Sequence, residues 1–145
     1  MCSTWHHSSI KTSHHGMFLL SRMFWGASSF NQNWSSWNIS SASDIGNMFR
    51  GTTSFNQDVS SWNVSSVTDM SYMFYRESSF NRDLPSWDVS AVTTMREMFY
   101  DVSSFNQDLS AWDVSSVTDT RNMFFCVYLP SIKICRHGMF LLLLT

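Results

Sequence analysis

The chain repeats itself every 25 residues, and this repeat limits the possible folds more than any other feature of the sequence. A Met-Phe pair begins at positions 23, 48, 73, 98 and 123, with no insertion between the copies. One copy, from Met98 to Asn122, reads MFYDVSSFNQDLSAWDVSSVTDTRN. A unit this short cannot bury its own apolar residues, so neighbouring copies have to stack on one another. The repeat therefore predicts an elongated array in which equivalent residues form ladders.

Two apolar patterns alternate within each copy. Leu84, Trp87 and Val89 have the L-x-x-L-x-L spacing that is typical of a short strand and its lead-in. The apolar residues from Val92 to Phe99 step by three and then by one, which predicts one face of a short helix. The S-x-x-D sequence that ends at Asp69 resembles a capping box at the start of such a helix. We therefore expect an α/β repeat, a solenoid in which each 25-residue coil has a short strand and a short helix.

The composition changes at both ends of the repeats. All eleven Asp and Glu residues lie within residues 23–125, whereas all five His, all three Cys and both Lys lie outside that range. We expect an atypical and poorly ordered flank over 1–22, four to five repeats over 23–125, and a second atypical flank over 126–145. The flanks share nine of twelve positions between SIKTSHHGMFLL and SIKICRHGMFLL. They are interpreted either as genuine terminal segments or as translated sequence bordering a truncated array.

Several functional classes are disfavoured by composition. The formal net charge is −2, and charged residues are 14% of the chain, so the basic footprint that nucleic acids require is missing. No segment approaches the roughly 20 apolar residues of a membrane-spanning helix, and the N-terminus lacks a secretory signal pattern. The repeats contain no His, Cys or Lys and no glycine-rich phosphate loop. We therefore expect no enzyme, no catalytic residues, no cofactor and no nucleic-acid partner.

Repeated acids and a histidine run are the candidates for a metal site. The glycines that accompany calcium-binding repeats are absent, and we interpret one acidic column as helix caps instead. The four histidines lie in a polar segment outside the repeats, where a solvated tail is the expectation. We therefore predict no metal site. The candidates are the columns Asp58, Asp83, Asp108 and Asp44, Asp69, Asp119, with Thr94 interrupting the second, and the run His6, His7, His14, His15.

Two ladders of repeated residues are expected to be structural. Stacked Asn amides can bond to each other and to turn backbone that would otherwise lack a partner. A Trp ladder can form either part of the core, which the strand spacing favours, or an exposed platform for sugars or peptides. The ladders consist of Asn31, Asn56, Asn81 and Asn106, and of Trp37, Trp62, Trp87 and Trp112.

A further set of residues differs between otherwise equal coils and forms the candidate recognition surface. Its ligand, a protein or a carbohydrate, is not identified by the sequence. The alternative function is that of a structural spacer or a solenoid that self-associates end to end, because neither end of the array has a polar cap. The candidate surface consists of Arg50, Arg76, Glu77, Arg82 and Asp101.

Units such as SSFNQDLSAWDVSSVTDTRNMF resemble the BspA-like leucine-rich repeat surface proteins, whose 25-residue unit is also described as DUF285 or a bacterial surface-protein repeat. The resemblance covers Met23 to Phe125 and includes MF, SFNQ and W-[ND]-[VI]-S-S-V-T-D-M. It implies a leucine-rich-repeat-like solenoid, a cell-surface or secreted location, and adhesion or recognition as the function. The sequence departs from the leucine-rich pattern by a Trp at a central Leu position and by Val92 in place of Asn.

Overall fold

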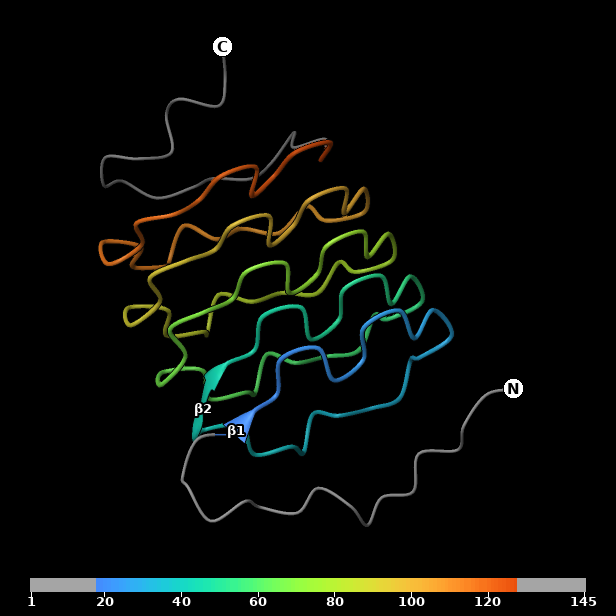
Figure 1. Cartoon of the computed structure of the whole chain (residues 1–145), viewed down its shortest axis with the longest axis horizontal. Helices are drawn as coiled ribbons and strands as arrows, with labels where there is room; N and C mark the ends of the chain where they lie inside the picture. Colours follow the sequence, from blue (N-terminus) through green and yellow to red (C-terminus); the bar gives the residue numbers. More distant parts are fainter. Residues whose placement is uncertain (1–17, 128–145) are drawn as a thin grey trace.

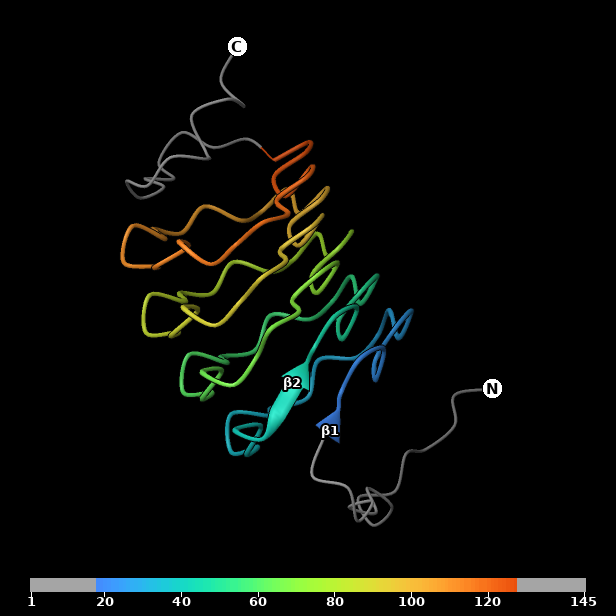
Figure 2. The ribbon, with the colours of Figure 1, turned by 60° about the vertical axis from the view of Figure 1, so that its left-hand side comes forward.

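The computed structural model describes residues 18–127, which wind into a stack of similar layers (Figures 1 and 2). Each layer is one 25-residue turn of the chain, which we call a coil. The period appears directly in the hydrogen bonds, because residues 25 positions apart are joined repeatedly along the chain, as in the bond from the Thr93 N–H to the Thr68 carbonyl at 2.9 Å. The sequence period is therefore the period of the stack.

Regular secondary structure is sparse and lies along one line of the stack. Strand β1, Phe18–Leu19, pairs in parallel with strand β2, Ala42–Asp44, and the two form a two-stranded sheet. Isolated parallel bridges continue this line from β2 into the later coils: Asp44 with Asp69, Asp69 with Thr94, and Thr94 with Asp119.

The α/β repeat solenoid expected from the sequence is wrong, because residues 18–127 contain no helix. The segment expected to be helical forms successive tight turns in which an N–H bonds to the carbonyl three residues earlier, as from Met98 to Met95. Glu97 and Asp101 have φ angles of 52° and 57°, and a right-handed helix cannot contain such left-handed residues. The spacing of three residues between apolar side chains in this segment therefore results from a run of turns.

The strand expected at Leu84, Trp87 and Val89 is also replaced by turns. The Trp87 N–H donates to the Leu84 carbonyl at 3.2 Å, and the Val92 N–H donates to the Val89 carbonyl at 2.9 Å. The inter-coil bridges lie later in the unit, at Thr94 and its equivalents. Since residues 18–127 contain no helix, no helical membrane span occurs among them.

One side of every coil is joined to the next coil by backbone hydrogen bonds. Within residues 70–77, alternate N–H groups donate to carbonyls 24 residues later, for example from Tyr72 to Arg96 at 2.9 Å. The intervening N–H groups close turns within their own coil, for example from Tyr75 to Tyr72 at 3.2 Å. The same alternation occurs at residues 20–27, 45–52 and 95–102. We call this the backbone-paired side.

Two rows of stacked Phe rings fill the centre of the stack. Successive rings of the first row lie 5.5 to 5.7 Å apart, and those of the second row lie 6.0 to 6.2 Å apart. Within a coil the two rows touch, as between Phe74 and Phe80 at 4.0 Å. The first row consists of Phe24, Phe49, Phe74, Phe99 and Phe124, and the second of Phe30, Phe55, Phe80 and Phe105.

The first coil begins before the boundary expected at Met23. Besides the pairing of β1, the Arg22 N–H donates to the Gly46 carbonyl at 3.1 Å, and Leu20 is buried. Residues 18–22 are thus part of the stack, although they were expected to form a poorly ordered flank. Val127 likewise packs against the core. The rest of both expected flanks, including the histidine run, lies outside the described residues.

Candidate functional site

The side of each coil opposite the backbone-paired side is held to its neighbours by side chains. It comprises residues 28–41, 53–66, 78–91 and 103–116, and we call it the side-chain-paired side. The Asn56 N–H donates to the Asn31 Oδ1 at 3.1 Å, and the pattern recurs from Asn81 to Asn56 at 3.2 Å and from Asn106 to Asn81 at 3.0 Å. The amide oxygen thus takes the place of a carbonyl of a sheet ladder. The Asn31 and Asn81 oxygens also accept from the side-chain amides of Gln57 and Gln107, both at 2.7 Å.

The Trp ladder is buried and also joins coils. Trp62, Trp87 and Trp112 are 3%, 2% and 4% exposed. Each Nε1–H donates to a carbonyl 28 residues earlier, at 2.9 to 3.0 Å. Trp37, in the first coil, is half-buried. Buried indoles whose N–H groups are already bonded cannot form the exposed platform that was the alternative. The accepting carbonyls belong to Trp34, Val59 and Leu84.

Serine hydroxyls add further bonds on the same side. The Ser86 Oγ donates to the Ser60 carbonyl at 2.8 Å, and the Ser104 Oγ donates to the Ser78 carbonyl at 2.6 Å. Among the described residues, no hydrogen bond on this side joins the backbones of two coils. Every inter-coil bond there therefore depends on a particular side chain.

The acidic columns stabilise turns within their own coils. The Asp44 and Asp69 Oδ1 atoms each accept the N–H two residues later at 2.7 Å, which is an Asx turn and not the expected helix cap. The Ser60 hydroxyl and N–H lower the pKa of Asp58 by hydrogen bonding to its carboxylate. Within residues 18–127, no three His, Cys, Asp or Glu side chains are arranged to hold a metal ion.

On the backbone-paired side, four positions of each coil carry side chains that change from coil to coil. The repeated inter-coil bonds there join main chains, so no side chain has to recur. Ser21 adds a side-chain bond to the Gly46 carbonyl at 2.9 Å. We call these positions the variable face. They are Ser21, Gly46, Ser71, Arg96 and Arg121; Arg22, Asn47, Tyr72, Glu97 and Asn122; Trp25, Arg50, Tyr75, Tyr100 and Phe125; and Gly26, Gly51, Arg76, Asp101 and Cys126.

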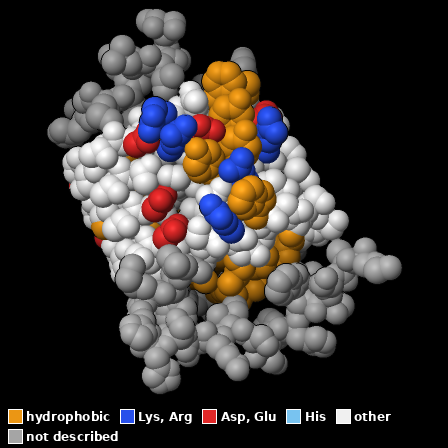
Figure 3. Space-filling view, viewed as in Figure 1, with side chains coloured by type: hydrophobic (Ala, Val, Ile, Leu, Met, Phe, Trp, Pro, Cys, Tyr) orange, Lys and Arg blue, Asp and Glu red, His pale blue; other side chains and the backbone are white. Residues whose placement is uncertain are grey.

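A continuous row of aromatic and guanidinium groups crosses the variable face. Tyr75 and Tyr100 stack with ring centroids 4.8 Å apart, and Tyr100 and Phe125 stack at 4.9 Å. The Arg50 guanidinium continues the row, 4.5 Å from the Tyr75 ring and 4.8 Å from the Trp25 ring. Trp25 and Phe125 are half exposed, at 50% and 51%. Figure 3 shows hydrophobic and cationic side chains interleaved on one face of the molecule.

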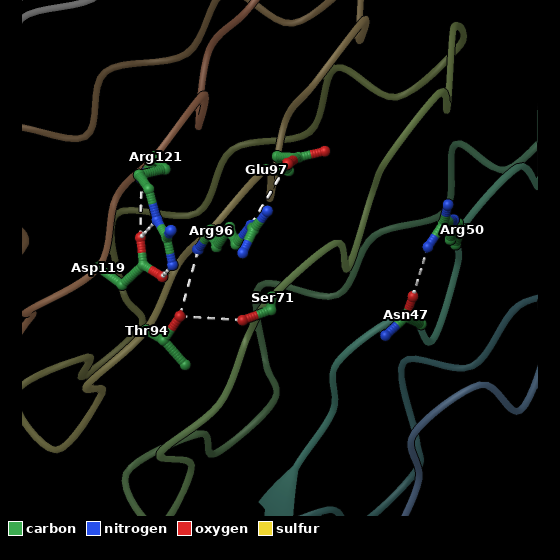
Figure 4. A network of polar contacts seen from close by, with 8 residues as sticks. All are labelled: Asn47, Arg50, Ser71, Thr94, Arg96, Glu97, Asp119 and Arg121. Atoms are coloured by element: carbon green, nitrogen blue, oxygen red, sulfur yellow. Dashed lines mark hydrogen bonds and ion pairs between the residues drawn. The ribbon is translucent and has the colours of Figure 1, made fainter.

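The arginines of the variable face fall into two groups. Figure 4 shows the first, in which Arg96 pairs with Glu97 at 3.3 Å and Arg121 pairs with Asp119 at 2.6 Å. The Arg121 hydrogen bonds hold the pKa of Asp119 at about 2. These two contacts are the ion pairs found among the described residues.

The second group contains arginines that lie over aromatic rings and have no carboxylate partner within residues 18–127. The Arg22 guanidinium lies 5.4 Å from the Trp25 ring, and the Arg76 guanidinium lies 5.3 Å from the Tyr75 ring. Arg50 also contacts the Tyr72 ring at 5.1 Å and donates from Nη1 to the Asn47 Oδ1 at 3.1 Å.

The structure separates the five residues that the sequence grouped as a recognition surface. Arg50, Arg76 and Asp101 belong to the variable face. Arg82 lies on the side-chain-paired side, where its Nε donates to the Asn56 carbonyl at 2.7 Å. Glu77 is fully buried and points into the core. The last two are therefore not placed to join the other three in one surface.

Glu77 lies in the corner between the two sides. Its Oε2 accepts the Phe80 N–H, whereas its Oε1 has no hydrogen-bond partner. Burial raises the pKa of this carboxyl to about 7, because the charged form has lost its water. Equivalent positions in the neighbouring coils hold Thr52 and Val102, so the buried acid occurs in this coil and not in the two coils beside it.

The aromatic members of the variable face were missed by sequence reasoning. Trp25, Tyr75, Tyr100 and Phe125 occupy one 25-residue column with Arg50. The signal that groups them is present in the sequence, because this column changes along the repeats while columns such as that of Asn81 do not. Whether a variable column faces water or the core, as at Glu77, depends on the turn geometry.

Comparison with known proteins identifies a family for this chain. The family model for DUF285, described as a Mycoplasma protein of unknown function, matches residues 18–130. No curated protein and no solved structure matches the chain. The family match begins at the first residue of β1, where the described stack also begins.

Proposed function

The chain belongs to the DUF285 family, and we propose that it is a non-catalytic recognition module that binds its ligand through the variable face. The proposal includes a cell-surface or secreted setting and a role in adhesion, which the resemblance to BspA-like surface proteins supports. The variable face lacks His and Lys among its side chains, and its one Cys, Cys126, stands at the last coil. Binding is therefore the chemistry that the face offers.

The segregation of varied side chains onto one face is the observation that carries this proposal. The residues that join coils through their side chains recur with little change, whereas those of the variable face change along the stack. A spacer would require only the recurrent residues. The exposed Trp25 and the partly exposed Tyr and Arg side chains of this face together have the composition of the energetically dominant part of protein interfaces.

A selection experiment tests this proposal. The intact chain is immobilised and used to select from a displayed random-peptide library and to probe a glycan array. The face variant carries Trp25→Ser, Arg50→Ser and Tyr75→Ser. The control is Arg82→Gln, which removes an arginine from the side-chain-paired side. It introduces the Gln that stands at the equivalent positions 57 and 107.

We expect the wild-type chain and the control to enrich the same ligands and the face variant to lose them. Thermal unfolding of all three proteins checks that each is folded. Ligands that bind the face variant as well as the wild type would contradict the proposal. Failure of every library to yield a ligand would favour the spacer alternative instead.

A further inference from the structure

We infer that the ligand of the variable face is an acidic polypeptide segment; this inference rests on the proposed function. The first reason is the distribution of charge. The variable face carries five arginines against two acids of its own. Three further acids border it, since Asp119 pairs with Arg121 and the Asp44 and Asp69 carboxylates lie beside Gly46. The remaining described residues carry nine acids against one arginine, a surplus of eight negative charges when all are ionised. Five of the six arginines among the described residues thus lie on this face, and Arg22, Arg50 and Arg76 are the three of them that form no ion pair there.

The second reason is that three of these arginines form no ion pair with a carboxylate of the described residues. Arg22, Arg50 and Arg76 rest over Trp and Tyr rings instead. A guanidinium held in this way keeps N–H donors for a carboxylate, which it can bind through two parallel hydrogen bonds. The Arg50 Nη1 also donates to the Asn47 Oδ1, and its other N–H groups remain. The supporting rings reduce the side-chain entropy lost on binding. Aspartate and glutamate side chains are the complementary groups in a polypeptide.

The third reason concerns the orientation of the aromatic rings. Tyr75 and Tyr100 lie within 18° of parallel, and Tyr100 and Phe125 lie within 14°. Rings stacked along the row cover each other's faces, so their edges and hydroxyl groups remain for a ligand. A sugar ring binds an aromatic side chain through its face, which the inner rings of this row do not offer. Apolar and tyrosine side chains of a polypeptide pack well against ring edges.

The arrangement therefore combines apolar anchors with separated cations. The half-exposed Trp25 and Phe125 lie at the two ends of the row, with Arg50 and the two stacked Tyr rings between them. An extended segment that alternates acidic with aromatic or aliphatic residues would contact both kinds of group. A purely anionic chain would leave the apolar anchors without partners.

Binding of a labelled copolymer tests this inference. The probe is a fluorescein-labelled random copolymer of glutamate and tyrosine, and its fluorescence anisotropy is measured against the intact chain at low and moderate salt. Heparin is the competing polyanion without apolar side chains. We expect the copolymer to bind, and we expect its affinity to fall as the salt concentration rises. It should bind at least tenfold more tightly than heparin.

Two variants and one footprint locate the binding. Arg50→Gln combined with Arg76→Gln should weaken copolymer binding about tenfold or more, equivalent to at least 1.4 kcal/mol. The matched control Arg82→Gln should change binding less than twofold. In the wild-type protein, the copolymer should protect Arg22, Arg50 and Arg76 from phenylglyoxal while leaving Arg82 reactive, and this readout does not depend on any variant being folded.

Three results would overturn the inference. Heparin binding as tightly as the copolymer, with the same dependence on Arg50 and Arg76, would indicate an anionic glycan. Equal protection of all four arginines would show that the variable face is not the binding surface. Selection of non-acidic peptides that still require the variable face would refute the acidic class while leaving the proposed function intact.

Discussion

The two long sides of each coil solve the same problem, the pairing of backbone groups between coils, by different means. On the backbone-paired side, an N–H such as that of Phe74 reaches the carbonyl of Met98 directly at 3.0 Å. On the side-chain-paired side, the bonds run through an Asn amide, a Trp indole or a Ser hydroxyl, as from the Trp87 Nε1 to the Val59 carbonyl at 3.0 Å. The first kind of bond is available to any residue except proline, whereas the second needs a particular side chain.

This difference explains where the sequence repeats and where it varies. A substitution on the side-chain-paired side removes an inter-coil bond, so its Asn, Trp and Ser residues recur. A substitution on the variable face leaves the main-chain ladder intact, so Arg50 can stand where Tyr75 and Tyr100 stand in later coils. Stability and recognition are thus carried by different sides of one short unit.

The largest expected effect is the loss of a buried indole. Trp87→Ala removes a fully packed ring, its stacking on Trp112 at 6.4 Å, and the donor to the Val59 carbonyl. We expect a loss of roughly 3–5 kcal/mol in the free energy of unfolding. Tyr75→Ala, the matched change on the other side, should cost less than half as much. Chemical denaturation of both variants makes the comparison, and equal losses would show that the two sides contribute alike.

The next effect is a pH dependence from Glu77. Its folded-state pKa of about 7 lies above the ordinary value of 4.5, so the folded protein favours the protonated acid. The contribution to stability is therefore full below pH 4.5 and is lost as pH rises towards 7, with a limit of roughly 3 kcal/mol. Glu77→Gln should flatten this part of the stability profile and stabilise the protein at pH 8.

Melting temperatures between pH 4 and pH 8 measure the effect. Asp101→Asn, which alters an exposed acid of the variable face, should retain the wild-type pH profile. A Glu77→Gln variant whose melting temperature depends on pH as that of the wild type does would show that burial does not raise the pKa of this carboxyl.

A smaller effect is expected from the Asn ladder. Asn81→Ala removes the acceptor for the Asn106 N–H at 3.0 Å and for the Gln107 Nε2 at 2.7 Å. Asn81 is exposed, so water can replace part of what is lost, and we expect a cost of about 1 kcal/mol. Asn81→Asp keeps the acceptor and should restore most of the loss. Unfolding curves of the two variants distinguish the hydrogen bond from the rest of the side chain.

The smallest effect on stability should come from the residue most important to the proposed binding. Arg50→Gln leaves every inter-coil backbone bond in place and removes the cation–π contacts and the hydrogen bond to the Asn47 Oδ1, all at a partly exposed site. We expect a change within about 0.5 kcal/mol. A loss comparable to that of Trp87→Ala would mean that the variable face also holds the stack together, which would break the comparison between the sides.

The difference between expectation and structure is clearest at Val92 to Phe99. The steps of three in its apolar residues fit both a helix and a run of turns that close on the third preceding residue. The decisive facts are the positive φ angles of Glu97 and Asp101; Asp favours that conformation less than glycine does, and Glu does not favour it. Equivalent positions hold Gly26, Gly51, Asn47 and Asn122, which favour positive φ, but also Tyr72 and Arg76 with φ angles of 60° and 56°, which do not mark it.

Arg82 and Glu77 show a second limit of the same kind. Both differ from their equivalents in neighbouring coils, and difference alone placed them with Arg50 in one expected surface. In the structure, Arg82 substitutes for a Gln in an inter-coil bond, and Glu77 turns inward. Variation between coils indicates that a position tolerates several residue types. It does not indicate whether the side chain points to solvent or to the core.

By itself, the sequence determined the 25-residue period, the ladders that follow from it, and the family to which the chain belongs. A strict period requires equivalent residues to meet their copies in the neighbouring coil, whatever the conformation inside each coil. Only the tertiary structure decided that the coils consist of turns, that one side is paired by main chain and the other by side chains, and that the varied residues share one face. Those outcomes depend on backbone angles that tertiary packing selects, and local residue preferences are too weak to dictate them.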